Sequence, residues 1–247
     1  MCKKPLFRCL AFSLIEMLVS IAIISVLAVL ATSVLGTLKT KGALAKDLAN
    51  LRQIGTGVLG YAQDNNLQLP NLTAKTSGGT WVWPFWCDSI APYLGMERTT
   101  EYTGQGGITT IGVFRSPYRG DYHHSGASDY GANNFVIVDG ADYPFSVKPA
   151  ASLPQITSPS KVILVANAIA TGGWSAWPKG EFAWFFNGWD VGPGGDHPRP
   201  YPIWGKTFNA VYADGSVKAT DYQEFLSNSA TYIGGNAPLN DIRYVPQ

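Results

Sequence analysis

The sequence is poor in charged residues and in cysteine. Only 14% of its 247 residues are Asp, Glu, Lys or Arg, against about 25% in typical soluble domains. Of the three cysteines, Cys2 and Cys9 lie within the first eleven residues, so Cys87 is the only thiol left in the rest of the chain. One thiol cannot form an intrachain disulfide, and the cysteine spacing fits no zinc site.

The charge distribution excludes an extended basic surface. The net charge is +1, and residues 1–11 contain Lys3, Lys4 and Arg8 but no acid. The remaining chain therefore has 15 basic residues (18 less 3) and 17 acidic ones, a balance near −2. Nucleic-acid binders carry a basic patch or stripe, so no nucleic-acid partner is expected.

A long apolar run follows the basic N-terminus. Residues 12–35 contain one charged side chain, Glu16, in 24 positions. As a helix this run would be about 36 Å long, enough to cross a hydrocarbon core of about 30 Å. Basic residues flank it on both sides, since Lys39, Lys41 and Lys46 follow. The leader nevertheless favours a cytoplasmic N-terminus, with the remainder outside the cytoplasm.

Residues 36–66 continue the helix with an amphipathic pattern. Apolar residues and one glycine recur at helical spacing: Leu44, Leu48, Leu51, Gly55 and Val58 or Leu59. Polar residues lie between them: Lys46, Asp47, Asn50, Arg52 and Gln53. This pattern predicts one buried stripe and a solvated polar face. Asn65, Asn66 and Pro70 are expected to end the helix.

Residues 67–247 predict a β-rich head. Short runs rich in β-branched or aromatic residues occur at 108–114, 135–138, 161–166 and 208–212, separated by glycine- and proline-rich turns. Asp214-Gly215 lies between two such runs and predicts a β-hairpin. The expected fold class is α+β, with a long N-terminal helix packed on this head.

The start of the apolar run carries the most specific motif. A short basic leader ends at Ala11, and Phe12-Ser13-Leu14-Ile15-Glu16 opens the helix. This closely resembles the cleavage and N-methylation site of type IV prepilins and pseudopilins. The resemblance implies that prepilin peptidase cuts between Ala11 and Phe12, and that Phe12 becomes the methylated N-terminus. It also implies an assembly role for Glu16, whose carboxylate neutralises the terminal amine of a neighbouring Phe12.

Two departures accompany this resemblance. Ala11 stands before the cut where the family usually has Gly, and the apolar run lacks the mid-helix proline of many pilins. The pairing of Glu16 with an amine remains physically reasonable, because opposite charges buried among apolar helices are tolerated only together.

The rest of the chain resembles prepilin-like proteins with an H-x9-D-G C-terminal signature. The matching segments include residues 51–55, 61–66 and 213–217. The histidine of the signature would fall at Trp204, while His197 lies too far upstream. Relatives often carry Cys where this chain has Ser116, so a cystine with Cys87 is absent.

These resemblances imply a structural subunit of a pilus or secretion pseudopilus, not an enzyme. The expected layout is a leader (1–11), a transmembrane and assembly helix (12–35), its amphipathic continuation (36–66) and the head (67–247). Expected partners are prepilin peptidase, other pilin or pseudopilin subunits and the inner-membrane assembly machinery. The expected location is the inner membrane, then a periplasmic pseudopilus or a surface filament. An uncleaved single-pass anchor, with Glu16 at the membrane interface, is an alternative.

Two further binding hypotheses remain open. Trp81, Trp83 and Trp86 cluster in one segment and could form an aromatic platform for glycans, although a place in the core is the favoured interpretation for most of the tryptophans. Acidic residues in turn-rich stretches could hold calcium: Asp139, Asp142, Asp190, Asp196, Asp214 and Asp221. His123-His124, with Asp121 and Asp129 nearby, is interpreted as a loop without a ligand, as is His197. No catalytic motif is recognised.

Overall fold

We analysed a computed structural model of the chain. The structure describes residues 13–71, 73–75, 81–97, 100–102, 108–118, 128–133, 151–156, 158–169, 185–186, 199–228 and 231–232. The chain divides into two compact units, Met1–Ala43 and Leu44–Gln247, and each is described by itself. We call the second unit the head.

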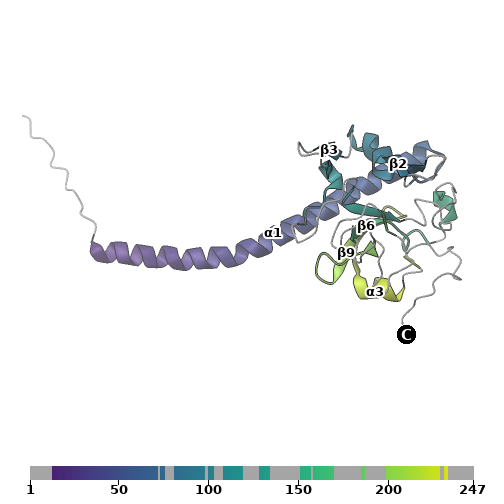
Figure 1. The fold of residues 1–247 in the computed structure, drawn as a ribbon. Coiled ribbons are helices and arrows are strands. Elements are labelled where there is room, and N and C mark those ends of the chain that lie inside the picture. Colours follow the sequence, from purple (N-terminus) through teal and green to yellow (C-terminus); the bar gives the residue numbers. More distant parts are fainter. Residues whose placement is uncertain are drawn as a thin grey trace, which may run out of the picture. The chain divides into compact units, whose positions relative to one another are not determined.

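A single helix, α1 (Leu14–Asp64), runs from the first unit into the head (Figure 1). This confirms the expected long N-terminal helix. In the first unit its apolar side chains face outward, with Leu14 87% exposed and Leu30 59% exposed. The hydroxyls of Ser20 and Ser25 donate to the carbonyls of Glu16 and Ile21, one turn earlier. These polar groups are therefore satisfied within the helix itself.

The helix ends where the asparagines predict. Asn66 has a φ of 55° and Leu67 a φ of 62°, a left-handed conformation that asparagine tolerates well and leucine adopts rarely. The Leu67 N–H donates to the carbonyl of Ala62 at 2.7 Å, which closes the last turn. The Leu67 carbonyl then accepts from the Leu153 N–H at 2.8 Å, so this contact helps to hold the strained residue.

A six-stranded sheet forms the centre of the head, in the order β10-β9-β6-β5-β7, with β8 also paired to β6. Its strands are β5 (Tyr130–Asn133), β6 (Ile163–Ile169), β7 (Phe185–Phe186), β8 (Arg199–Pro200), β9 (Thr207–Tyr212) and β10 (Val217–Asp221). All pairs are antiparallel except β5 with β7. The fold is therefore α+β, as predicted.

Smaller elements complete the described part of the head. Two hairpins pair β1 (Thr73–Lys75) with β2 (Trp81–Phe85) and β3 (Thr100–Tyr102) with β4 (Ile108–Thr110). The helices are α2 (Trp86–Ile90), η1 (Ala91–Leu94), η2 (Gly112–Phe114), η3 (Leu153–Gln155) and α3 (Tyr222–Ser227).

The structure confirms some of the predicted strands and contradicts part of one. Residues 208–212 lie in β9, and the hairpin through Asp214-Gly215 is confirmed by the antiparallel pairing of Val217 with Val211. Residues 161–166 overlap β6. The prediction for 108–114 is wrong in its second half, because Gly112 has a φ of 60° and the chain turns into η2. Residues 135–138 lie outside the described ranges.

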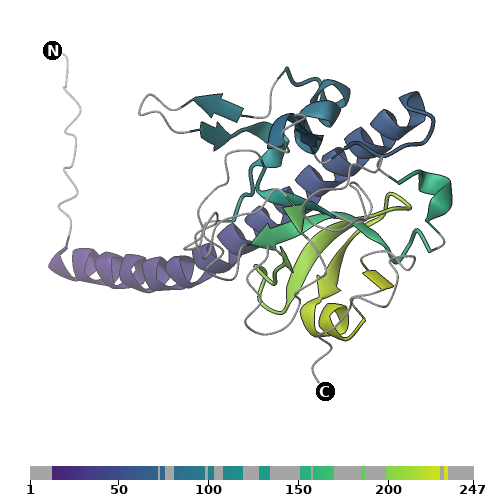
Figure 2. The same ribbon diagram turned by 45° about the vertical axis from the view of Figure 1, so that its right-hand side comes forward.

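Helices cover both faces of the sheet (Figure 2). Residues of α1 pack on one face with Val165 and Val211, in a core that includes Leu51, Ile54 and Val58. On the other face, Phe225 of α3 packs with Phe208 and Ala210 of β9. The alternation of β9 side chains between these two cores is the period of two expected for a strand buried on both faces.

Glycines let α1 approach its neighbours closely. A Cβ at Gly55 would lie 2.9 Å from Cγ1 of Val211, and one at Gly57 would lie 3.1 Å from Cδ2 of Leu94. Both helix positions face packed side chains, so the absence of a side chain there sets the separation of α1 from the sheet and from η1.

We expect Gly55→Ala to destabilise the head by up to about 2 kcal/mol, because overpacking against Val211 costs about 1–3 kcal/mol and the helix propensity of alanine returns roughly 1 kcal/mol. Gly42→Ala is the control, since a Cβ there meets nothing within 4 Å. Urea denaturation of both variants checks this. An unchanged midpoint for Gly55→Ala would mean that the sheet moves aside without cost.

Candidate functional site

The first turn of α1 contains the predicted assembly residue. Ala11 and Phe12 lie outside the described residues. Glu16 is exposed, and one of its carboxylate oxygens accepts from the backbone N–H of Ser13 at 3.4 Å. The Glu16 side chain thus bends back toward the start of the helix, where the partial positive charge of the helix dipole favours an anion.

The apolar part of α1 has the properties of a membrane-crossing helix. Its apolar stretch is not buried against any other part of the described chain. Among the described residues this is the one helix long and apolar enough for a bilayer. A surface of this kind is stable in lipid or against other apolar helices.

A second polar site lies inside the head, where the sheet register places polar residues in a row. Tyr130 of β5 pairs with Asn167 of β6, and the Asn209 N–H of β9 donates to Oδ1 of Asn167 at 3.0 Å. The neighbouring row is apolar, with Val165 paired to Val211. The sheet therefore offers α1 one polar row and one apolar row.

Asp47 of α1 lies against the polar row and is fully buried. One carboxylate oxygen accepts from the Tyr130 hydroxyl at 2.8 Å and from Nδ2 of Asn167 at 3.1 Å. The other accepts from Nδ2 of Asn209 at 2.7 Å and from Nε1 of Trp204 at 2.9 Å. We call these five residues the Asp47 cluster.

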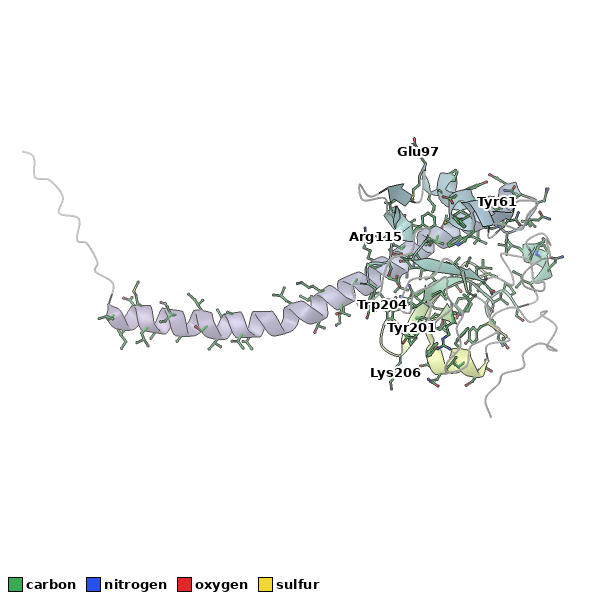
Figure 3. The ribbon with its side chains drawn as sticks, viewed as in Figure 1. Tyr61, Glu97, Arg115, Tyr201, Trp204 and Lys206 are labelled. Carbon is green, nitrogen blue, oxygen red and sulfur yellow. The ribbon has the colours of Figure 1, made fainter. Side chains whose placement is uncertain are left out.

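Asn50 extends the cluster by one turn. Its Nδ2 donates to the Tyr130 hydroxyl at 3.2 Å and to the carbonyl of Arg115 at 3.1 Å. Because the Tyr130 hydroxyl accepts this bond, its own proton is directed toward Asp47. Figure 3 labels Arg115 and Trp204 beside the part of α1 that lies in the head.

The electrostatics of the cluster follow from its burial. Burial raises the pKa of Asp47, while the four hydrogen bonds lower it and so offset part of that effect. Burial, with the nearby charge of Asp47, also raises the pKa of Tyr130 well above its usual value, so its hydroxyl stays a donor. The amide nitrogens of Asn167 and Asn209 and the indole nitrogen of Trp204 can only donate. This donor set fits a carboxylate.

The structure corrects the sequence interpretation at these positions. Asp47 and Asn50 were predicted to lie on the solvated face of the helix, and both are buried. Asp47 precedes Leu51 by four residues and Ile54 by seven, so helical spacing places it on the stripe that faces the sheet. The sequence pattern assigned Asp47 to the solvated face because its side chain is polar.

Trp204 has a defined role in this cluster. Trp204 stands where the resemblance to the H-x9-D-G signature would place a histidine, and its indole N–H donates to Asp47. Its ring also meets Tyr118 edge-on, with a centroid distance of 5.4 Å. Sequence reasoning identified the position but not the contact.

The structure describes two of the six acidic residues that were considered as calcium ligands. Asp214 accepts from the Ser216 N–H, and Asp221 caps α3 by accepting from the backbone N–H groups of Gln223 and Glu224. These two carboxylates therefore serve a turn and a helix cap. The described residues contain no group of three potential metal ligands. Asp139, Asp142, Asp190, Asp196 and the three histidines lie outside the described ranges.

One of the three tryptophans of the hypothetical glycan platform, Trp86, is not available to a ligand. Trp86 is fully buried in α2 and packs edge-on against Phe114, so it cannot stack on an external sugar. Trp81 and Trp83 lie in β2, but their side chains are outside the described part of the structure, and the glycan hypothesis stays a prediction.

We expect Asp47→Ala to cost at least about 3 kcal/mol of unfolding free energy, because four donors lose their buried acceptor. Asp64→Ala, on the same helix, is the matched control. The Asp64 carboxylate accepts one exposed bond from the Tyr93 hydroxyl, so its loss should cost about 1 kcal/mol or less. Chemical denaturation measures both, and equal costs would contradict the importance of the Asp47 cluster.

Comparison with known proteins identifies the N-terminal site. Residues 6–32 match the family model described as the prokaryotic N-terminal methylation motif. No curated protein and no solved structure matches the chain. The motif implies processing by prepilin peptidase, membrane anchoring before assembly and association with other pilin subunits. The motif is typical of structural subunits, and it shows a likeness of the N-terminal segment to type IV pilin-like proteins.

Proposed function

We propose that this protein is a structural subunit of a type IV pilus or of a type II secretion-like pseudopilus. The observation that carries the proposal is an unburied apolar helix that begins within a methylation motif. In this proposal residues 1–11 are the leader, 12–35 the transmembrane and assembly helix, 36–66 its continuation and 67–247 the head.

The proposed life cycle has two stages. The precursor sits in the inner membrane with its leader in the cytoplasm and its head outside, held by residues 12–35. After cleavage between Ala11 and Phe12, the assembly machinery transfers the helix from lipid into a filament. The exposed apolar side chains of α1 exchange lipid contacts for contacts with other subunits, so the apolar surface stays out of water throughout.

Glu16 is proposed to neutralise the amine that cleavage creates at Phe12. Its carboxylate already lies within 3.4 Å of the Ser13 nitrogen, one residue from that amine in sequence. An unpaired ammonium or carboxylate among apolar helices is costly. A carboxylate at the start of the helix, directed toward its N-terminal end, can accept the amine of a neighbouring copy.

Mass spectrometry of the native protein tests the processing step. The expected mature N-terminus is a methylated Phe12, and loss of prepilin peptidase should leave the precursor with residues 1–11. A mature protein that retains its first eleven residues would overturn the proposal and favour an uncleaved single-pass anchor.

The assembly role of Glu16 predicts a separate result. Glu16→Ala should leave membrane insertion intact but reduce filament yield at least tenfold, because removing one partner of a buried charge pair costs about 3–5 kcal/mol. Glu16→Asp should restore part of the yield. Ser20→Ala is the control, since the Ser20 hydroxyl bonds only the exposed backbone of the same helix. Normal yield for Glu16→Ala would remove the proposed role.

A further inference from the structure

Two different kinds of contact hold the head's part of α1. Past Leu51 the buried residues are apolar or glycine, including Ile54, Val58 and Ala62, which pack in the main core. Before Leu51 the buried residues are Asp47 and Asn50. Leu44 and Leu48, the apolar residues of this stretch, are only half-buried. The first two turns of α1 in the head are therefore held mainly by hydrogen bonds.

These two contacts respond differently to separation. Moving Leu51 and Ile54 away from the sheet would expose the centre of the core, so it cannot happen without unfolding the head. Moving Asp47 and Asn50 away exposes polar groups that water can hydrogen-bond, so the cost is the net strength of the lost hydrogen bonds and not the exposure of an apolar core. The polar turns can therefore separate while the apolar turns stay packed.

We propose that residues 44–50 of α1 form a releasable contact, held closed by the Asp47 cluster and independent of the apolar contact beyond it. In the closed state the head holds α1 from Leu44 onward. In the released state it holds α1 from Leu51, and the free helix gains two turns, about 10 Å at 1.5 Å per residue.

Trp204 is the residue of the Asp47 cluster at which this contact can be weakened. Asp47, Asn167 and Asn209 are fully buried, whereas Trp204 is half-buried. Trp204 is thus the one of the four donor residues that is partly exposed to solvent, and its indole donates one of the four bonds. Because Trp204 is outside the main apolar core, loss of its N–H should favour release without disturbing that core. We assign to Trp204 the role of positioning residue for the helix.

Distance measurement between spin labels tests the proposal in the full chain. Cys2 and Cys9 are replaced by serine, and Cys87 is left in place because it is buried. One label pair is Lys46→Cys with Lys206→Cys, which spans the releasable turns. The reference pair is Thr56→Cys with Lys206→Cys, which spans the apolar-held turns. All three labelled positions are exposed.

Trp204→Phe keeps an aromatic ring but removes the donor, and Trp204→His keeps a ring N–H. For Trp204→Phe we expect a second, longer distance in the 46–206 pair and an unchanged single distance in the 56–206 pair. Trp204→His should return the 46–206 pair to one distance. Asp47→Asn should release more strongly, because its amide N–H groups face other donors.

Three results would overturn the proposal. If both pairs lengthen together, α1 moves or unfolds as one piece. If neither pair changes in Trp204→Phe, the polar turns are not separable. If Trp204→His behaves like Trp204→Phe, the ring N–H is not what holds them. Circular dichroism establishes that each variant is folded, and Trp204→Phe decides the question if Asp47→Asn does not fold. The measurement uses the isolated subunit, so its result does not depend on processing or assembly.

Discussion

A carboxylate removed from water is stable only where other donors replace its hydration, and in the head this requirement links α1 to the sheet. Asp47 has four such donors, from β5, β6, β9 and the turn before β9. Each comes from a different part of the sequence, so the carboxylate is satisfied only when the sheet register and the helix rotation are both correct. A slip of one residue in any strand would turn its donor to the other face of the sheet. The Asp47 cluster therefore favours one arrangement of helix on sheet.

The apolar contacts of α1 serve a different purpose. Leu51, Ile54 and Val58 are fully buried in the core between helix and sheet, at about 1.5–3 kcal/mol for each large side chain. Such contacts are non-directional and specify orientation weakly. The glycines at 55 and 57 add a steric requirement, because a Cβ would lie 2.9 Å from the Val211 side chain at position 55 and 3.1 Å from the Leu94 side chain at position 57. The helix is thus held by apolar burial and aligned by hydrogen bonds, and the two act at different turns.

The first unit follows the opposite rule. The large apolar side chains described there are exposed, and the hydroxyls of Ser20 and Ser25 bond to their own helix. The described serine hydroxyls near the N-terminal end of α1 are thus satisfied within the helix, whereas Asp47 and Asn50 depend on donors and acceptors from the head. This division fits the proposed passage from lipid to a filament, since the apolar side chains there need only an apolar partner, while Glu16 is the residue proposed to need a donor from a neighbouring copy.

The sequence by itself determined the features that depend on local pattern. The apolar run, the methylation motif with Glu16, the asparagines at the end of α1 and the Asp214-Gly215 hairpin all act within a few residues, so their spacing in the chain is sufficient. Only the tertiary structure decided the burial of Asp47 and Asn50, because a buried acid is stable only with donors that lie 83 to 162 residues away. It also decided the role of Trp204, since a position matched to a histidine signature does not reveal what its side chain touches. The conversion of residues 112–114 from strand to η2 likewise required the left-handed backbone of Gly112.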